Sequence, residues 1–326
     1  MRRAEILVGL ALVALLTVAT PAAARQTRLV VGFSGVKQLT YAAMLIALER
    51  ARDRGYEVVP VFFPRPELAV QALLRGETDL ARIEPSSVSV AIARGAGLAI
   101  VGAAATSQWV LVSPRSVTAP AQLARRRVAV HSVASMSNTV VQYAIKKYKI
   151  AQPQILIIPG SPARAQALMQ GEIDATSLFL TDAIRIEQLA PGRFHVLVDF
   201  REMPMVDSVI VARRDWIPGH REEIEDVLRG LLETHRRIAA GPEWGAARTR
   251  QLFPDEDAAF VSAVVRAYIA RGVWDQNGGI DHLTAAGRMV RFLKEIEALP
   301  AGAPDGAASY VELGPLQDVL KRIGRK

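Results

Sequence analysis

A ten-residue phrase occurs twice in this chain. It reads ALLRGETDLA at Ala72–Ala81 and ALMQGEIDAT at Ala167–Thr176, and both copies contain Gly-Glu-x-Asp. Each copy follows a helical stretch and precedes an apolar run. The phrase therefore predicts a corner at which glycine ends a helix and aspartate opens a buried strand. Any α/β protein contains such corners, but two copies in the same context indicate a chain built from two similar halves.

The predicted elements around the two copies also repeat. Apolar strand runs alternate with helices, which indicates an α/β architecture with largely parallel sheets. The first pass predicts strands at 27–33, 56–63, 78–83, 98–106 and 109–114, and the second predicts strands at 126–132, 154–160 and 172–179. After about residue 205, one more strand (206–216) precedes helices at 220–241, 256–272, 285–299 and 314–324. This last block lacks strands for a sheet of its own, so we expect it to pack on one of the two halves.

The amino-terminal segment has the pattern of a secretory signal peptide. Basic residues at Arg2 and Arg3 precede an apolar run from Ile6 through Ala19, and Ala22–Ala24 follow a proline. A retained anchor is the alternative, but the run is shorter than the about 18–20 residues that a spanning helix needs. We expect cleavage after Ala24 and a periplasmic protein. The chain has no cysteine, which excludes a lipid-anchored protein, disulfides and thiolate metal sites.

Composition and motifs argue against several function classes. The net charge of +8 is spread along the chain, the longest cationic run is Arg125–Arg127, and aromatic residues make up only 6%. No nucleic-acid partner is expected, since such binding needs a concentrated basic patch. Ser34–Lys37 matches Ser-x-x-Lys, but the companion motifs of serine β-lactamases are missing. The five histidines lack metal-like spacing and are predicted to be solvated or core residues. We expect no catalytic site, no metal and no cofactor.

The order of several stretches resembles a known family. VVGF, ALLRGETDLA, VSVAIARGAGLAIVGA, APAQLARRRVAVHSVAS and ALMQGEIDAT are similar in order and spacing to the nitrate/sulfonate/taurine-type solute-binding proteins of ABC importers. The resemblance implies an α/β, two-lobed class II periplasmic binding protein fold with a cleft between the lobes. It places lobe one at 27–111 plus 209–326 and lobe two at 112–208, with crossings near Val110–Pro114 and Met205–Ile210. It also implies a monomer that docks on the ABC permease subunits.

The cleft of such a fold is lined by loops at the carboxyl ends of strands, where helix amino termini offer free N–H groups. We expect a serine-rich helix start after residue 131 to hold an anionic group, and N-capping is the alternative role of these serines. The candidate ligand-binding residues are Ser34, Gln38, Arg82, Glu84, Ser86, Ser87, Trp109, Ser132, Ser135, Met136, Ser137, Phe179 and Asp182.

Two charged candidates depart from the family pattern, which has small residues at this place. Arg82 and Glu84 are two residues apart on a predicted strand, so both side chains are expected on one face. Either Arg82 binds a ligand carboxylate or sulfonate with its planar fork, or Arg82 and Glu84 form an ion pair on the lobe surface. Trp109 and Phe179 are either aromatic walls of the cleft or core residues.

The resemblance implies that the protein captures a small solute in the periplasm and delivers it to an ABC importer by hinge closure. It allows nitrate, alkyl sulfonates, taurine, aromatic carboxylates or pyrimidines as the solute. The serines and Arg82 favour an anionic organic solute, sulfonate- or carboxylate-like. The alternatives are an exported sensor partner that is not coupled to transport, and an exported enzyme on the same scaffold.

Overall fold

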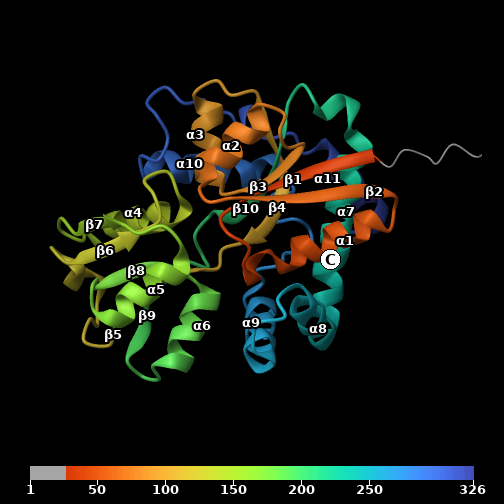
Figure 1. Cartoon of the computed structure of the whole chain (residues 1–326). Coiled ribbons are helices and arrows are strands. Elements are labelled where there is room, and N and C mark those ends of the chain that lie inside the picture. Colours follow the sequence, from red (N-terminus) through yellow and green to blue (C-terminus); the bar gives the residue numbers. More distant parts are fainter. Residues whose placement is uncertain (1–26) are drawn as a thin grey trace, which may run out of the picture.

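Two five-stranded sheets with flanking helices form the two lobes of the protein (Figure 1). The computed structural model describes residues 27–326, so the predicted signal peptide and its cleavage after Ala24 lie outside the described residues. The first sheet has the order β2-β1-β3-β10-β4 and the second the order β7-β6-β8-β5-β9. The strands of the first sheet are β1 (Thr27–Ser34), β2 (Tyr56–Phe63), β3 (Leu80–Ile83), β4 (Leu98–Thr106) and β10 (Val206–Arg213). Those of the second are β5 (Trp109–Pro114), β6 (Arg127–Val130), β7 (Gln154–Ile157), β8 (Ala175–Phe179) and β9 (Phe194–Asp199).

Helices follow most strands, and the four predicted carboxy-terminal helices lie near their expected ranges. They are α1 (Ala42–Arg52), α2 (Pro66–Leu74), α3 (Pro85–Ala93), α4 (Met136–Tyr148), α5 (Ser161–Gln170), α6 (Leu180–Leu189), α7 (Arg221–Ala240), α8 (Pro242–Leu252), α9 (Ala258–Arg271), α10 (Leu283–Glu295) and α11 (Gly314–Ile323). The sequence did not predict α6, α8 or β9. α6 begins directly after β8, with Phe179 as its N-cap and no side-chain cap, so no loop residues separate the two elements. Among residues 27–326, no helix is long and apolar enough to span a membrane.

The carboxy-terminal helices pack on the first lobe, as expected for a block without strands of its own. α7 packs along α1 and against β4, and α11 packs against both α7 and β4. Gly230 of α7 lies so close to α1 that a Cβ added there would be 3.3 Å from the carbonyl oxygen of Ala47. Four of the five strands in each sheet run in the same direction, as expected for largely parallel sheets, and β10 and β5 are the exceptions. β10 runs antiparallel to β3 and β4, and β5 runs antiparallel to β8 and β9, because both strands enter their sheets from the other lobe.

The pairing partners of β5 and β10 indicate where one lobe ends and the other begins. β5 pairs only with second-sheet strands and β10 only with first-sheet strands. The predicted boundaries at 111/112 and 208/209 would divide these two strands. We therefore propose that the chain passes between the lobes at 107–108 and again at 200–205.

The repeated phrase forms the same corner in each lobe. Gly76 and Gly171 adopt left-handed conformations with φ of 73° and 74°. The N–H of Asp79 donates to the carbonyl of Val30 at 2.8 Å, and the Asp79 carboxylate accepts from the Val30 N–H at 2.7 Å. Asp174 makes the same two bonds to the backbone of Arg127, both at 2.9 Å. We call this pair of bonds the aspartate clasp. It fixes the neighbouring parallel strand at the entry of β3 and of β8.

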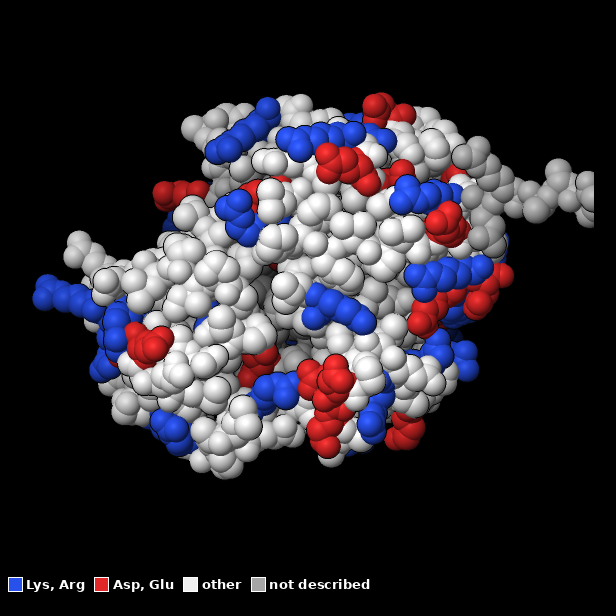
Figure 2. Space-filling model, viewed as in Figure 1, with Lys and Arg blue, Asp and Glu red and all other residues white. Residues whose placement is uncertain are grey.

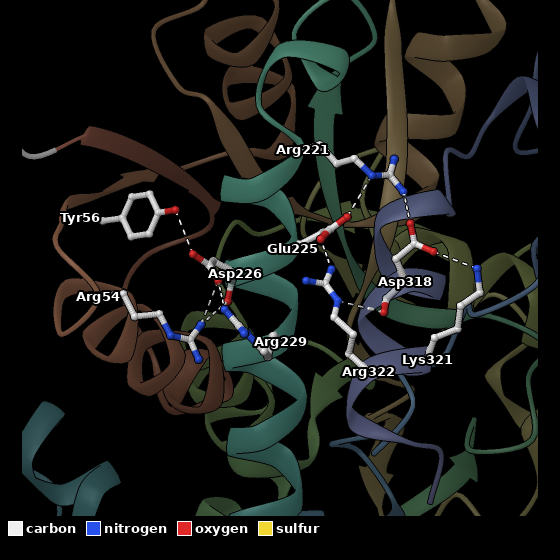
Figure 3. Close-up of polar contacts among 9 residues, drawn as sticks. All are labelled: Arg54, Tyr56, Arg221, Glu225, Asp226, Arg229, Asp318, Lys321 and Arg322. Carbon is white, nitrogen blue, oxygen red and sulfur yellow. Dashed lines mark hydrogen bonds and ion pairs between the residues drawn. The ribbon is translucent and has the colours of Figure 1, made fainter.

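A surface network of ion pairs connects α7 to its neighbours (Figure 3). Asp226 accepts hydrogen bonds from Tyr56 of β2 at 2.9 Å and from Arg54 at 3.3 Å. Glu225, one residue earlier on α7, pairs with Arg322 of α11. Exposed pairs contribute only about 0–1 kcal/mol each. The buried apolar face of α7 therefore contributes more to stability than these charges do.

The left-handed glycine of the second corner gives a prediction for stability. Gly171→Ala should lower the free energy of unfolding by about 1–2 kcal/mol, because an L-residue with a side chain is strained at this φ. No neighbouring atom lies within 4 Å of the new Cβ, so the loss would come from the backbone alone. The measurement is urea unfolding, and Gly97→Ala is the matched control. Gly97 has equally open surroundings without a left-handed φ, and equal effects of the two variants would contradict the prediction.

Candidate ligand-binding cleft

A cavity of about 170 Å³ lies between the two lobes, at the carboxyl ends of the parallel strands. Figure 2 shows the surface hollowed near its centre, between the lobes, and charges of both signs scattered around it. Eight of the predicted residues line the cavity, namely Ser34, Gln38, Glu84, Trp109, Ser135, Met136, Ser137 and Phe179. Arg82, Ser86, Ser87, Ser132 and Asp182 do not line it. The sequence analysis missed Tyr41, His131, Ser161 and Arg164, which do.

The first-lobe wall centres on a carboxyl group. The hydroxyl of Ser34 donates to Oε2 of Glu84 at 2.6 Å, and Tyr41 donates to the backbone carbonyl of Ser34. Burial raises the pKa of Glu84 to about 7, although the bond from Ser34 acts in the opposite direction. Glu84 makes no ion pair within residues 27–326. The wall thus presents a carboxyl that gains or loses its proton near neutral pH.

The side chain of Arg82 forms its ion pair inside the first lobe and not in the cavity. Its guanidinium pairs with Oδ2 of Asp207 at 3.1 Å and lies over the ring of Tyr41, 4.4 Å from the centroid. Gln108 donates to the same oxygen of Asp207, also at 3.1 Å. No ion pair joins Arg82 to Glu84, so the predicted surface pair is wrong. The sequence analysis missed Asp207 because β10 reaches β3 only after the chain has passed through the second lobe.

The second-lobe wall contains the amino termini of two helices. Ser135 is the N-cap of α4 and its hydroxyl accepts from the N–H of Asn138. The capping role of this serine is therefore present, and the residue lines the cavity as well. Ser137 accepts from the N–H of His131 at 2.6 Å. α5 begins at Ser161, after Gly160, and has no side-chain cap. Pro162 has no N–H and the N–H of Arg164 donates to the carbonyl of Gly160, so the N–H groups of Ser161 and Ala163 are the ones left for an anion.

Arg164 of α5 is a buried cation on this wall. Only 1% of the residue is exposed, and its guanidinium donates to the carbonyls of Ser177 and Ile158 at 3.1–3.2 Å. Burial lowers the pKa of Arg164 to about 10, while the negative charge of Asp182 acts in the opposite direction. The guanidinium therefore stays charged at neutral pH. No carboxylate in the described part of the chain forms an ion pair with it. Helical spacing could have identified it, because Arg164 and the buried Leu168 are four residues apart and share one face.

His131 follows β6 and lines the same wall. Its Nδ1 accepts from the N–H of Gly160 at 2.9 Å, so the neutral ring carries its proton on Nε2. Burial, with the nearby charge of Arg164, lowers its pKa and favours this neutral form. Within the described residues Nε2 has no hydrogen-bond partner. The sequence analysis predicted that each histidine is either solvated or buried in the core. His131 instead lines the cavity, whereas His235 is buried in the core as predicted.

Two aromatic rings form an apolar part of the cavity. Trp109 and Phe179 lie with ring centroids 4.4 Å apart, on adjacent antiparallel strands. Both residues are more than nine-tenths buried, and both line the cavity. The two roles left open by the sequence, core residue and cleft wall, are thus combined in each ring.

The lobes touch one another on both sides of the cavity. On one side, Ser86 and Ser87 of α3 donate to the carbonyl of Ala134, at 3.2 and 2.8 Å, and Ser132 donates to Glu67 at 3.2 Å. On the other side α6 and α9 lie side by side (Figure 1). There the hydroxyl groups of Thr181 and Tyr268 are 2.7 Å apart. The remaining predicted residue, Asp182, is buried on α6.

Sequence comparison assigns the chain to a family. A family model described as the periplasmic substrate-binding protein of phosphonate ABC transporters matches residues 35–255, more than half of the chain. The chain belongs to this family. No curated protein matches its sequence significantly. The resemblance to the substrate-binding proteins of ABC importers is thereby confirmed.

Solved structures of periplasmic substrate-binding proteins share the fold. The alkanesulfonate-binding protein SsuA from Xanthomonas axonopodis pv. citri is 16% identical, with a TM-score of 0.68 over 87% of this chain and 98% of its own. The aliphatic sulphonate-binding protein SsuA from Escherichia coli is 21% identical, with a TM-score of 0.63 over 86% and 96%. The nitrate-binding protein NrtA from Synechocystis PCC 6803 is 11% identical, with a TM-score of 0.74 over 92% and 90%. The two-lobed fold predicted from the sequence is confirmed.

The ion pair of Arg82 gives a prediction for this substrate-binding protein. Arg82→Met should lower the free energy of unfolding by about 3–5 kcal/mol, because it leaves the Asp207 carboxylate buried without its cation. Urea unfolding measures the loss. The double variant Arg82→Met/Asp207→Leu should recover most of it, since both charges are then removed. A loss below about 1 kcal/mol in the single variant would contradict a structural role.

Glu84 gives a prediction for the pH dependence of stability. Its folded pKa of about 7 lies above the ordinary value of 4.5, so the folded state favours its protonated form. This stabilisation is fully present below pH 4.5 and is lost as the pH rises through 7. Between pH 5 and pH 8 the ligand-free wild type should lose about 2–3 kcal/mol of unfolding free energy relative to Glu84→Gln.

The measurement is urea unfolding of both proteins at a series of pH values. His235 has the opposite trend, because burial lowers its pKa to about 4 and its contribution is lost as the pH falls below 6.5. That contribution is present in both proteins and cancels in the comparison. Parallel pH profiles would show that Glu84 ionises normally.

Proposed function

We propose that this protein captures a small anionic organic solute, sulfonate-, phosphonate- or carboxylate-like, and delivers it to an ABC importer. One observation carries the proposal: Arg164 is a buried cation on the cavity wall with no carboxylate paired to it. A buried charge without a partner is costly. An anion in the cavity would supply the missing charge.

Further groups on the second-lobe wall support an anionic headgroup. The amino termini of α4 and α5 both reach the cavity, and helix amino termini favour anions. The Nε2–H of His131 is a further unused donor. Trp109, Phe179 and Met136 line the same cavity, which favours an organic body over a bare inorganic ion. Relatives of the same fold are described as binding alkanesulfonates or nitrate.

Delivery by hinge closure is part of the proposal. Contacts on both sides of the cavity join the lobes, and two crossing segments connect them. A rotation about these segments would break the side contacts and open the cavity to the solute. We further propose export by the signal peptide with cleavage after Ala24, a monomeric protein in the periplasm, and docking on the permease subunits.

We propose binding without covalent chemistry. The Ser-x-x-Lys match does not form a nucleophile–base pair, because the hydroxyl of Ser34 bonds to Glu84 whereas Lys37 donates to the carbonyl of Leu252 at 2.8 Å. The groups that line the cavity are suited to holding a charge. Turnover of a bound solute by the purified protein would contradict this part of the proposal.

The test is a thermal-shift screen of the mature protein against sulfonates, phosphonates, carboxylates and nitrate. A ligand at 100 times its Kd adds about 2.7 kcal/mol of stability, which raises Tm by a few degrees. Unfolding and refolding before the screen removes a co-purified solute. Shifts with none of the anions would contradict the proposal and favour a sensor partner that does not bind such solutes.

Arg164 itself gives the sharper prediction. Arg164→Gln should weaken binding of the best anion at least about 100-fold, since the loss of a charged hydrogen-bond donor leaves the anion uncompensated. Arg164→Lys keeps the charge and should lose less. Calorimetry measures both. Arg115→Gln is the matched control, because Arg115 lies in the same lobe outside the cavity and donates to the carbonyl of Gly192. Wild-type affinity in Arg164→Gln would remove Arg164 from the site.

A further inference from the structure

Six basic residues meet at the end of the second lobe that lies away from the cavity. The amino ends of β6, β7 and β8 form one edge of the second sheet, and β5 ends at the same edge, where Pro114 pairs with Phe194 of β9. Figure 2 shows Lys and Arg side chains gathered at the left edge of the molecule, where Figure 1 places β6 and β7. The basic residues at this edge, which we call the basic end, are Arg115, Arg125, Arg126, Arg127, Lys149 and Arg193.

Carboxylates compensate only part of this charge. Asp174 pairs with Arg127 at 3.1 Å and with Arg126 at 4.0 Å. Glu172 and Glu187 lie at the same edge, but neither forms an ion pair within residues 27–326. The six cations thus outnumber the three carboxylates, and this end of the lobe carries a net positive charge. The fold has brought together cations that are far apart in the sequence.

Two of these cations occupy backbone conformations that favour glycine. Arg125 has a φ of 59° and Lys149 a φ of 51°, and nearby Gln152 has a φ of 42°. They are three of the four non-glycine residues with positive φ in the part of the chain that the structure describes. The N–H of Arg125 donates to the carbonyl of Ala151 at 3.2 Å, which joins the two loops. Strained backbone of this kind is concentrated at functional sites.

Local structure does not explain why these two residues are basic. Glycine or asparagine adopts a left-handed conformation more easily than arginine or lysine does. The side chains of Arg125 and Lys149 have no ion pair and no hydrogen-bond partner among the described residues. Both charges therefore face solvent at a cost to the backbone, which indicates a partner outside the chain.

We infer that the basic end binds the anionic surface of a phospholipid membrane. The inference goes beyond the proposed function and does not depend on which solute the cavity holds. The chain belongs to a family of periplasmic proteins, and the periplasm is bounded by phospholipid bilayers. Cations spread along the edge of a sheet suit an extended anionic surface, which attracts each basic residue that comes close to it.

An exposed apolar residue at the same end favours a membrane over other polyanions. α6 ends at Leu189, which is 65% exposed. The N–H of Arg193 donates to the carbonyl of Ala190 at 3.2 Å, so this leucine lies close to the basic end. Binding at a membrane surface combines electrostatic attraction with the burial of apolar side chains. A nucleic acid offers no apolar layer for such a residue.

The basic end and the cavity lie at opposite edges of the second sheet, because the cavity lies at the carboxyl ends of the parallel strands. Contact between the basic end and a membrane therefore leaves the cavity and the crossing segments uncovered. The protein could capture a solute and move its lobes while it stays at the membrane that holds its permease.

Cosedimentation of the mature protein with lipid vesicles tests the inference. Vesicles of phosphatidylglycerol with phosphatidylcholine present anionic headgroups, and vesicles of phosphatidylcholine alone are the neutral control. The protein should bind the neutral vesicles at least about tenfold more weakly. It should leave the anionic vesicles when salt is raised from about 0.1 M to about 1 M, because the Debye length falls from about 10 Å to about 3 Å.

The double variant Arg125→Asn/Lys149→Asn tests the assigned surface. It should weaken binding to anionic vesicles about tenfold or more, because each cation near the surface contributes about fivefold. Its Tm should equal or exceed that of the wild type, since asparagine fits the left-handed backbone better. The matched control is Arg94→Gln/Arg266→Gln, which removes two exposed cations of the first lobe that have no ion pair among the described residues. It should keep binding within about twofold.

The outcomes decide the inference without touching the proposed function, which is tested by solute binding. Absence of wild-type binding to anionic vesicles at about 0.1 M salt overturns it, and so does binding that persists at about 1 M salt. Equal losses in the two double variants also overturn it, because binding would then follow the net charge and not the basic end.

Discussion

The aspartate clasp is the interaction on which both lobes depend. Asp79 and Asp174 each bind the donor and the acceptor of one residue on the neighbouring parallel strand. Parallel strands are not joined by a hairpin turn that could set their register. Here the register is set by an aspartate that hydrogen-bonds to the backbone of the adjacent strand. With the register set at the amino ends of β3 and β8, the carboxyl ends of the strands meet at one level. The cavity lies at that level.

The two lobes share a second, buried polar cluster near the crossing segments. Asp207 at the start of β10 receives Arg82 from β3 and Gln108 from the first crossing. Tyr268 of α9 donates to Gln108 and contacts Thr181 of the second lobe. Each of these hydrogen bonds joins residues of different elements, and in a buried site such bonds are strong. This cluster therefore favours one orientation of the crossing segments relative to the first sheet.

Much of the architecture could be predicted from sequence because its signals are local. Apolar runs, helix-ending glycines and the repeated corner gave most strands and helices near their observed bounds. α6 was missed because no loop separates it from β8. The antiparallel direction of β5 and β10 depends on the path of the chain between the lobes. No local sequence pattern predicts that path.

The site was predicted less completely, for a similar reason. Strand-end positions such as Ser34, Glu84 and Ser135 follow from the fold class, and the structure places them in the cavity. The partner of Arg82 lies 125 residues away in sequence, so its pairing could not be foreseen. Arg164 lies inside helix α5 and not in a loop at the end of a strand. The fold class predicts ligand contacts from such loops, so it did not point to this residue.

The position of the clasp has a consequence for divergence. The clasps lie at the opening of β3 and β8, whereas the groups that face the cavity lie at the other end of the same strands or beyond. A change of solute specificity can thus accumulate substitutions at one end without disturbing the register set at the other. In this chain the strand register is fixed at one end of the strands, and the groups that contact a solute stand at the other.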